Sequence, residues 1–76
     1  MSKPLPSPSI LDDCEYLGAP YGRRHWRSGG GKRLYEWDSL HGEVEVHNGR
    51  GDHLGVLDPL TGEMIKPAVR ERTIDV

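Results

Sequence analysis

The chain has 76 residues, a formal net charge of −2 at pH 7, ten glycines, six prolines, no phenylalanine and one cysteine. A domain of this length buries only about 60% of the surface that its unfolded chain exposes, so we expect one thin, turn-rich core rather than a helical bundle. The lone Cys14 excludes an internal disulfide, and no apolar run approaches the ~20 residues that span a bilayer.

The N-terminal part of the chain predicts a tail and one helix. Residues 1–7 contain prolines and serines and are typical of a disordered tail. Ser7 followed by Pro8 is the pattern of a helix N-cap with proline at the first helical position, and Gly18 would end that helix. We therefore expect a short helix over residues 8–18, at the start of a single domain that spans residues 8–76.

The next segment, residues 19–32, is rich in cations and glycine. No acidic residue occurs between Tyr21 and Leu34. A basic segment that carries a tryptophan is typical of a phosphate-binding arm, whereas a solvated flexible loop is the alternative that the residues leave open. The side chains predicted to bind nucleic acid here are Arg23, Arg24, Trp26, Arg27, Lys32 and Arg33.

From residue 33 onward, apolar and polar side chains alternate with the period of a strand. The alternation predicts strands over residues 33–38, 43–47, 53–57 and 64–66, and a last edge strand over residues 72–76. The predicted fold is α+β and mainly β: a short N-terminal helix followed by a highly twisted antiparallel meander of four to five strands.

The predicted register between the second and third of these strands places Val44 opposite Val56 and His47 opposite His53. The same register places Gly55 opposite Glu45. A glycine there would leave open space above the carboxylate, as a substrate pocket needs, although a simple glycine bulge is the alternative.

The hairpin over residues 35–45 gathers side chains that suggest chemistry. Its acids lie on the face opposite the aromatic residues, and they are Glu36, Asp38, Glu43 and Glu45. Like charges on one face of a sheet are mildly destabilising, so this cluster indicates either chemistry or a basic partner. Cleavage of a phosphodiester needs a general base, a general acid and positive charge at the phosphate, and Asp38, His41 and Glu45 with an arginine supply these groups.

Three histidines, His41, His47 and His53, recur every six residues. No cysteine pair and no helical histidine spacing accompanies them, so neither a metal site nor a cofactor is predicted. His47 and His53 are interpreted as residues that line a nucleic-acid groove, with His53 as the better candidate for contact.

The central motif runs without a gap from Tyr35 to Glu45, after Arg23 to Trp26, and HLG at residues 53–55 and DPLTG at residues 58–62 follow it. This combination resembles the cytotoxic ribonuclease domain of the colicin and cloacin bacteriocins over about residues 23–76. The resemblance implies a metal-independent endonuclease that cuts small-subunit ribosomal RNA once, in the decoding site. By motif match, the catalytic positions of the family fall on Asp38, His41, Glu45 and Arg72.

The roles that follow from the resemblance are those of an acid–base transesterification. Glu45 would act as general base on the ribose 2′-hydroxyl, and His41 as general acid to the leaving 5′-oxygen. Asp38 would orient the imidazole, and Arg72 would stabilise the phosphorane. Strand alternation alone places Arg72 on the same face as Ile74, so its arrival at the site is implied by the resemblance only.

The resemblance also implies partners: the small ribosomal subunit with its RNA, and an immunity protein that restrains the toxin. We expect a monomer when free, acting on ribosomes in the cytoplasm, since no signal peptide is seen. Family domains are strongly basic, whereas this chain is weakly acidic, which makes RNA affinity more dependent on residues 23–33. Two alternatives stay open: a non-catalytic RNA- or ribosome-binding module on the same scaffold, and an interaction domain whose acidic face docks a basic protein.

Overall fold

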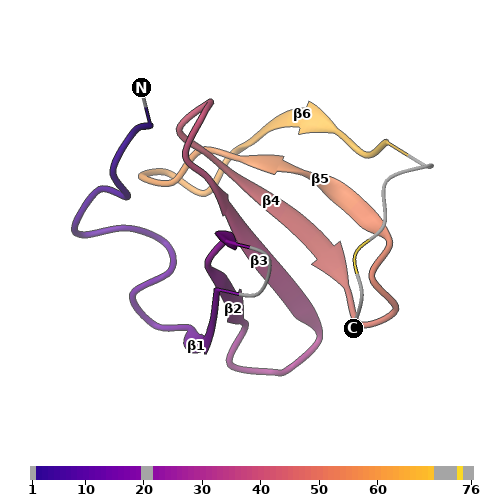
Figure 1. Cartoon of the computed structure of the whole chain (residues 1–76). Helices are drawn as coiled ribbons and strands as arrows, with labels where there is room; N and C mark the ends of the chain where they lie inside the picture. The colour runs from indigo at the N-terminus through magenta and orange to yellow at the C-terminus, as the bar shows by residue number, and fades with distance from the viewer. Residues whose placement is uncertain (1, 20–21, 70–73, 75–76) are drawn as a thin grey trace.

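The computed structural model describes residues 2–19, 22–69 and 74. They form one six-stranded antiparallel sheet in which each strand pairs with the next along the chain (Figure 1). The strands are β1 (Glu15–Gly18), β2 (His25–Arg27), β3 (Arg33–Asp38), β4 (Glu43–Asn48), β5 (His53–Leu57) and β6 (Met64–Pro67). The predicted antiparallel meander is therefore confirmed. Since the described residues contain no helix, none of them forms a helix that could cross a membrane.

The helix predicted over residues 8–18 is wrong, because this segment forms turns and then a strand. Ser9 and Asp12 compete for the backbone: the Ser9 hydroxyl accepts the Leu11 N–H, and the Asp12 carboxylate accepts the Ser9 N–H. The Cys14 N–H donates to the carbonyl of Leu11, three residues back, as in a single turn. Residues 15–18 then form a strand that pairs with β2, where a further helical turn was predicted.

The segment predicted as a basic arm also contributes to the sheet. β2 lies between β1 and β3, with Trp26 opposite both Tyr16 and Tyr35. The sheet therefore begins well before residue 33 and has six strands where four to five were predicted. A strand of three residues such as β2 is too short to show the alternation of apolar and polar side chains. It is recognised only by its pairing with the neighbouring strands.

The strands from residue 33 onward follow the predicted bounds closely. β3 and β5 match the prediction, β4 and β6 are each one residue longer, and the edge strand predicted over residues 72–76 falls outside the described residues apart from Ile74. The Ile74 N–H donates to the carbonyl of Gly51 at 2.9 Å, which fixes Ile74 beside the β4–β5 turn.

The predicted register of β4 against β5 is confirmed at one pair and wrong at the others. His47 faces His53, but a bulge next to Val46 shifts the rest by one residue, so that Gly55 faces Val46 and Glu45 faces Val56. The space beside Gly55 is also filled, since a Cβ there would lie 2.8 Å from Cε of Met64. The predicted open pocket above Glu45 at Gly55 is therefore wrong.

The core lies on one face of the sheet, where Leu11, Trp26, Trp37 and Val44 are buried together. The N-terminal segment covers this face: Leu5 packs against the cluster, and the Lys3 N–H donates to the carbonyl of Ser39 at 2.6 Å. The tail predicted as disordered thus makes specific contacts from residue 3 onward. The opposite face of the central strands carries the acidic residues.

Candidate active site

The acidic face of the central hairpin carries three buried carboxylates. Glu36 on β3 faces Glu45 on β4, and Asp38 faces Glu43. Only 7% of Glu36, 7% of Asp38 and 3% of Glu45 is exposed. Because burial of an unpaired charge is very costly, each of the three must have its own partner.

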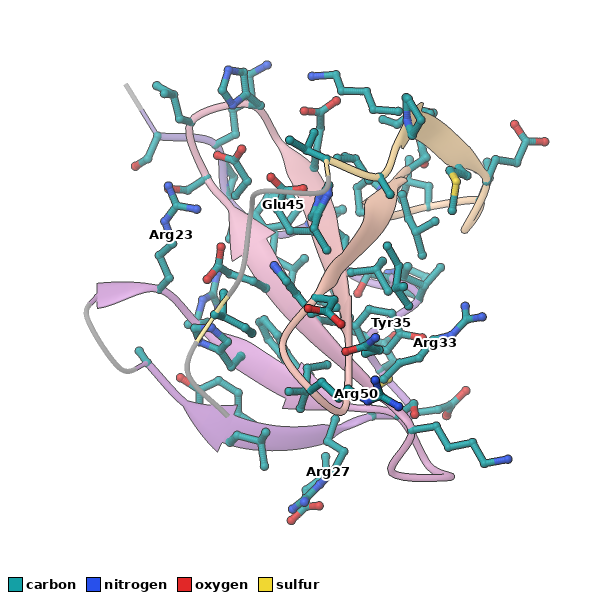
Figure 2. All side chains as sticks on the ribbon, turned by 90° about the vertical axis from the view of Figure 1, so that its right-hand side faces the viewer. Arg23, Arg27, Arg33, Tyr35, Glu45 and Arg50 are labelled. Carbon is teal, nitrogen blue, oxygen red and sulfur yellow. The ribbon has the colours of Figure 1, made fainter. Side chains whose placement is uncertain are left out.

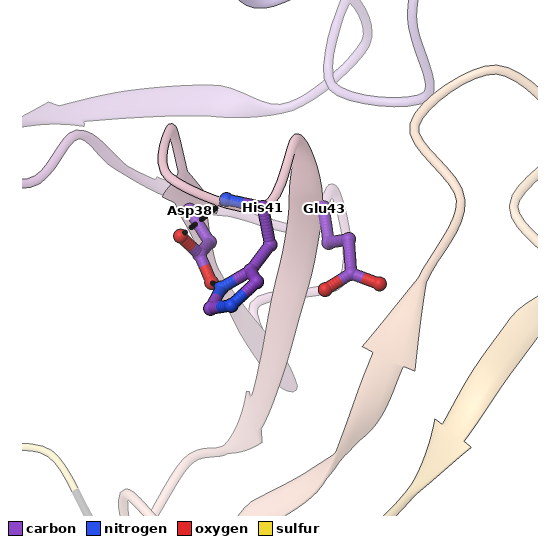
Figure 3. A group of neighbouring side chains, drawn as sticks. All are labelled: Asp38, His41 and Glu43. Atoms are coloured by element: carbon purple, nitrogen blue, oxygen red, sulfur yellow. Dashed lines mark hydrogen bonds and ion pairs between the residues drawn. The ribbon is translucent and has the colours of Figure 1, made fainter. Parts of the chain in front are cut away.

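Asp38 and His41 form a hydrogen-bonded pair at the β3–β4 turn (Figure 3). Nδ1 of His41 lies 2.8 Å from Oδ2 of Asp38, while Oδ1 accepts the backbone N–H groups of Leu40 and His41 at 3.1 and 3.2 Å. Gly42 closes this turn with a φ of 71°, a conformation that glycine adopts without strain. Asp38 therefore both shapes the turn and fixes the imidazole.

The environment of Asp38 favours its ionised form. Burial acts to raise the pKa of Asp38, but hydrogen bonds from the side chain and backbone of His41, with the charges of His41 and Arg23, outweigh it and lower that pKa. Since Nδ1 of His41 donates to the carboxylate, Nε2 is the nitrogen left to exchange a proton. The His41 side chain is 57% exposed, so it can reach a substrate.

Glu45 is held by His53 from the neighbouring strand β5. Nε2 of His53 lies 2.9 Å from Oε2 of Glu45, and Nδ1 of His53 accepts the backbone N–H of Val69 at 2.9 Å. A nitrogen that accepts a hydrogen bond carries no proton, so His53 is the neutral tautomer that donates through Nε2. His53 was predicted to contact nucleic acid, but its side chain is fully buried and instead positions Glu45.

Glu36 is held by an arginine and a histidine from the segment before β3. Its Oε1 accepts a hydrogen bond from Arg23 at 2.8 Å, and Nε2 of His25 lies 3.0 Å from its Oε2. Nδ1 of His25 lies 2.8 Å from the carbonyl of Arg23, which can only accept. The His25 ring therefore bridges the Arg23 carbonyl and the Glu36 carboxylate.

Arg23 lies within the field of all three buried carboxylates. The hydrogen bond with Glu36 raises the pKa of Arg23, burial opposes this rise, and the charges of Glu36, Asp38 and Glu45 add to it. Its guanidinium is therefore a permanent cation at the edge of the acidic face, with half of the side chain exposed. Sequence reasoning placed Arg23 among the nucleic-acid-binding residues and Glu36 in the acidic cluster, but it did not predict that the two pair, and it missed His25.

The other residues predicted to bind nucleic acid do not form one surface. Figure 2 shows Arg27 and Arg33 at the end of the sheet away from Arg23 and Glu45, and Lys32 precedes Arg33 in the β2–β3 turn. Arg27 is paired with Glu15 at 3.2 Å.

The two remaining predictions concern Trp26 and Arg72. Trp26 is 7% exposed, with Tyr16 against its ring and the Arg24 guanidinium 5.7 Å from the ring centroid, so it has little face left for a base. Arg72 lies outside the described residues, and its position at the site stays a prediction.

Among the described residues, Asp38, His41 and Glu43 are those that could hold a metal ion. One ligand atom from each lies within 4.8 Å of the others. These side chains also contact other groups of the protein, since Asp38 pairs with His41 and the Lys66 ammonium lies 3.0 Å from the Glu43 carboxylate. The sequence placed Glu43 in the acidic cluster but did not predict a metal site there.

Comparison with known proteins gives matches over most of the chain. Residues 16–75 match the model of a protein family described as Cytotoxic. The chain is 43% identical over 53 residues to colicin E3 of Escherichia coli, which is 68% of this chain and 10% of that protein. Cloacin and colicin-E6 of the same organism are each 42% identical over 53 residues, covering 68% of this chain and 9% and 10% of their own lengths. The chain thus spans about a tenth of the length of these relatives.

Proposed function

The chain belongs to the Cytotoxic family of colicin-type ribonuclease domains, and from this premise we propose that it is an endoribonuclease toxin that inhibits translation. Its substrate is the small-subunit ribosomal RNA, cut at the decoding site, and attack by the ribose 2′-hydroxyl leaves a 2′,3′-cyclic phosphate and a 5′-hydroxyl end. The observation that carries the proposal is an exposed imidazole fixed by Asp38 on the same face as the buried carboxylate of Glu45.

Each step uses a group already described. Glu45 takes the proton of the 2′-hydroxyl, whose oxygen then attacks the adjacent phosphorus, and His41 gives a proton to the leaving 5′-oxygen. His53 donates through Nε2 to the Glu45 carboxylate and holds it in position for this step. Because the nucleophile belongs to the RNA, the mechanism requires no metal ion.

Negative charge on the phosphorane is stabilised by arginine. The resemblance to the family assigns this role to Arg72. Arg23 adds a second guanidinium that the buried carboxylates keep charged and that Glu36 holds in place.

Intact ribosomes incubated with the full chain test the proposal, with the RNA ends mapped afterwards. We expect one discrete cut in the small-subunit RNA, and we expect Glu45→Gln and His41→Ala each to lower its rate roughly 10²–10⁴-fold. Glu63→Gln is the matched control, because Glu63 is an exposed glutamate in the β5–β6 loop and its loss should leave the rate unchanged.

Intact RNA at high protein excess would contradict the proposal. If ribosomes were still bound under those conditions, the non-catalytic RNA-binding module would be the better description. The interaction domain with an acidic docking face has less support, because the three buried carboxylates are already paired within the chain.

A nuclease of this kind needs a restraint in the cell that makes it, and we propose an immunity protein as the second partner. Expression in a host without such a protein should stop growth. Normal growth with soluble protein that still cleaves ribosomes in extracts would contradict this partner.

A further inference from the structure

A pocket of about 270 Å³ lies between the N-terminal segment and the residues that precede β2. Its lining includes Lys3, Arg23, Arg24, Trp37 and Ser39. No carboxylate occurs among its lining residues, whereas three of them are cations. The pocket therefore has a strongly positive character beside an acidic active site.

The N-terminal segment is fixed in place by the central hairpin. The backbone N–H of Lys3 donates to the carbonyl of Ser39 at 2.6 Å, and the Trp37 indole N–H donates to the carbonyl of Lys3 at 3.2 Å. The Lys3 ammonium reaches the carbonyl of His41 at 3.5 Å. Lys3 thus brings a cation to the turn that carries His41.

Only part of the positive charge of the pocket is balanced by carboxylates of the protein. Arg23 pairs with Glu36, which leaves further guanidinium donors to face an anion. Among the described residues, no carboxylate lies within ion-pair distance of Lys3 or Arg24. The Arg24 guanidinium lies 5.7 Å from the Trp26 ring centroid, a contact that leaves its positive charge in place.

We propose that this pocket binds a phosphate group of the RNA substrate next to the one that is cleaved. The proposal rests on the proposed function, because it takes RNA as the source of the phosphate. A volume of about 270 Å³ leaves room for a phosphate group among these side chains. The planar donors of the arginines and the ammonium of Lys3 match the oxygens of a phosphodiester.

A contact to a phosphate that does not react strengthens binding of substrate and transition state alike. The pocket should therefore lower KM and leave kcat nearly unchanged. Lys3→Gln tests this because it removes the charge but keeps most of the stem that packs over Gly42. Arg50→Gln is the matched control, since Arg50 lies on the β4–β5 turn at the other end of the hairpin (Figure 2).

The first measurement detects the pocket without any RNA cleavage. Inorganic phosphate is titrated into the full ¹⁵N-labelled chain at constant ionic strength, and the indole N–H signal of Trp37 is followed, because this group donates to Lys3. We expect a saturable shift in the native chain and in Arg50→Gln, and its loss in Lys3→Gln. The backbone amide of Gly49, beside Arg50, should not move in any of them.

The second measurement is the rate of ribosome cleavage. We expect Lys3→Gln to raise KM roughly five- to tenfold with kcat within twofold, and Arg50→Gln to change neither. An absent Trp37 shift, or equal KM for the two variants, would overturn the pocket while leaving the proposed nuclease intact. A Lys3-dependent shift in a chain that cuts no RNA would overturn the nuclease, and with it the assignment of the phosphate to RNA.

Discussion

Each buried carboxylate of the acidic face is paired with a different histidine: Glu36 with His25, Asp38 with His41, and Glu45 with His53. The exposed fractions of the histidine side chains are 13%, 57% and 0%, in the same order. Of the three histidines, His41 is the one whose ring is exposed to solvent. The other two hold their carboxylates in place: Nδ1 of His25 also contacts the Arg23 carbonyl, and Nδ1 of His53 accepts the Val69 N–H.

Asp38→Asn tests the pairing with His41 through the pH dependence of stability. The pKa of Asp38 is lowered in the folded chain, so its contribution is complete above its unfolded value of about 3.9 and is lost as the pH falls through the folded value. We expect the substitution to lower the free energy of unfolding by about 1–2 kcal/mol near neutral pH. Urea titrations should show this difference shrinking below about pH 4. A difference that stays constant from about pH 7 to about pH 3 would contradict the assignment.

Pairing between the last two strands depends on a glycine that has no room for a side chain. Gly55 has a φ of 153°, and a Cβ there would lie 2.8 Å from Cε of Met64 and 3.0 Å from the carbonyl oxygen of Lys66. The second contact is to backbone, which cannot move aside without separating β6 from β5. This close approach keeps β6 against β5, where the Lys66 ammonium reaches Glu43.

We expect Gly55→Ala to destabilise the chain by about 1–3 kcal/mol through strain and overpacking. Thermal unfolding should show the melting temperature falling by roughly 4–8 °C for each kcal/mol. Gly49→Ala serves as the control, because a Cβ at that position meets no atom within 4 Å. Equal melting temperatures for the two variants would show that the β5–β6 contact tolerates a side chain.

Positive and negative side chains occupy different parts of the structure, which the net charge of −2 does not show. The buried acids are paired with histidines and an arginine within the chain, while the cations Lys3, Arg23 and Arg24 line one pocket beside the active site. An approaching RNA would meet these cations rather than the average charge.

The rate constant kcat/KM for ribosome cleavage should therefore fall as salt rises, despite the acidic composition. On a double-logarithmic plot, each contacted phosphate contributes a slope of about −0.7 to −0.9, so the one phosphate held by these cations predicts a contribution of about that size. Lys3→Gln should make the slope shallower by about one, whereas Arg50→Gln should leave it unchanged. A rate independent of salt would show that these cations do not contact the RNA backbone.

The sequence by itself determined the family, the bounds of β3 to β6 to within one residue, and the pairing of Asp38 with His41. These features are encoded locally: alternation defines a strand, and three residues separate the carboxylate from the imidazole within one turn. Only the tertiary structure turned the predicted helix into β1, shifted the β4–β5 register at a bulge, brought His25 and His53 to the acidic face, and brought Lys3 to the turn that carries His41. Those contacts join segments far apart in the chain, and they form because buried carboxylates need partners wherever the fold can supply them.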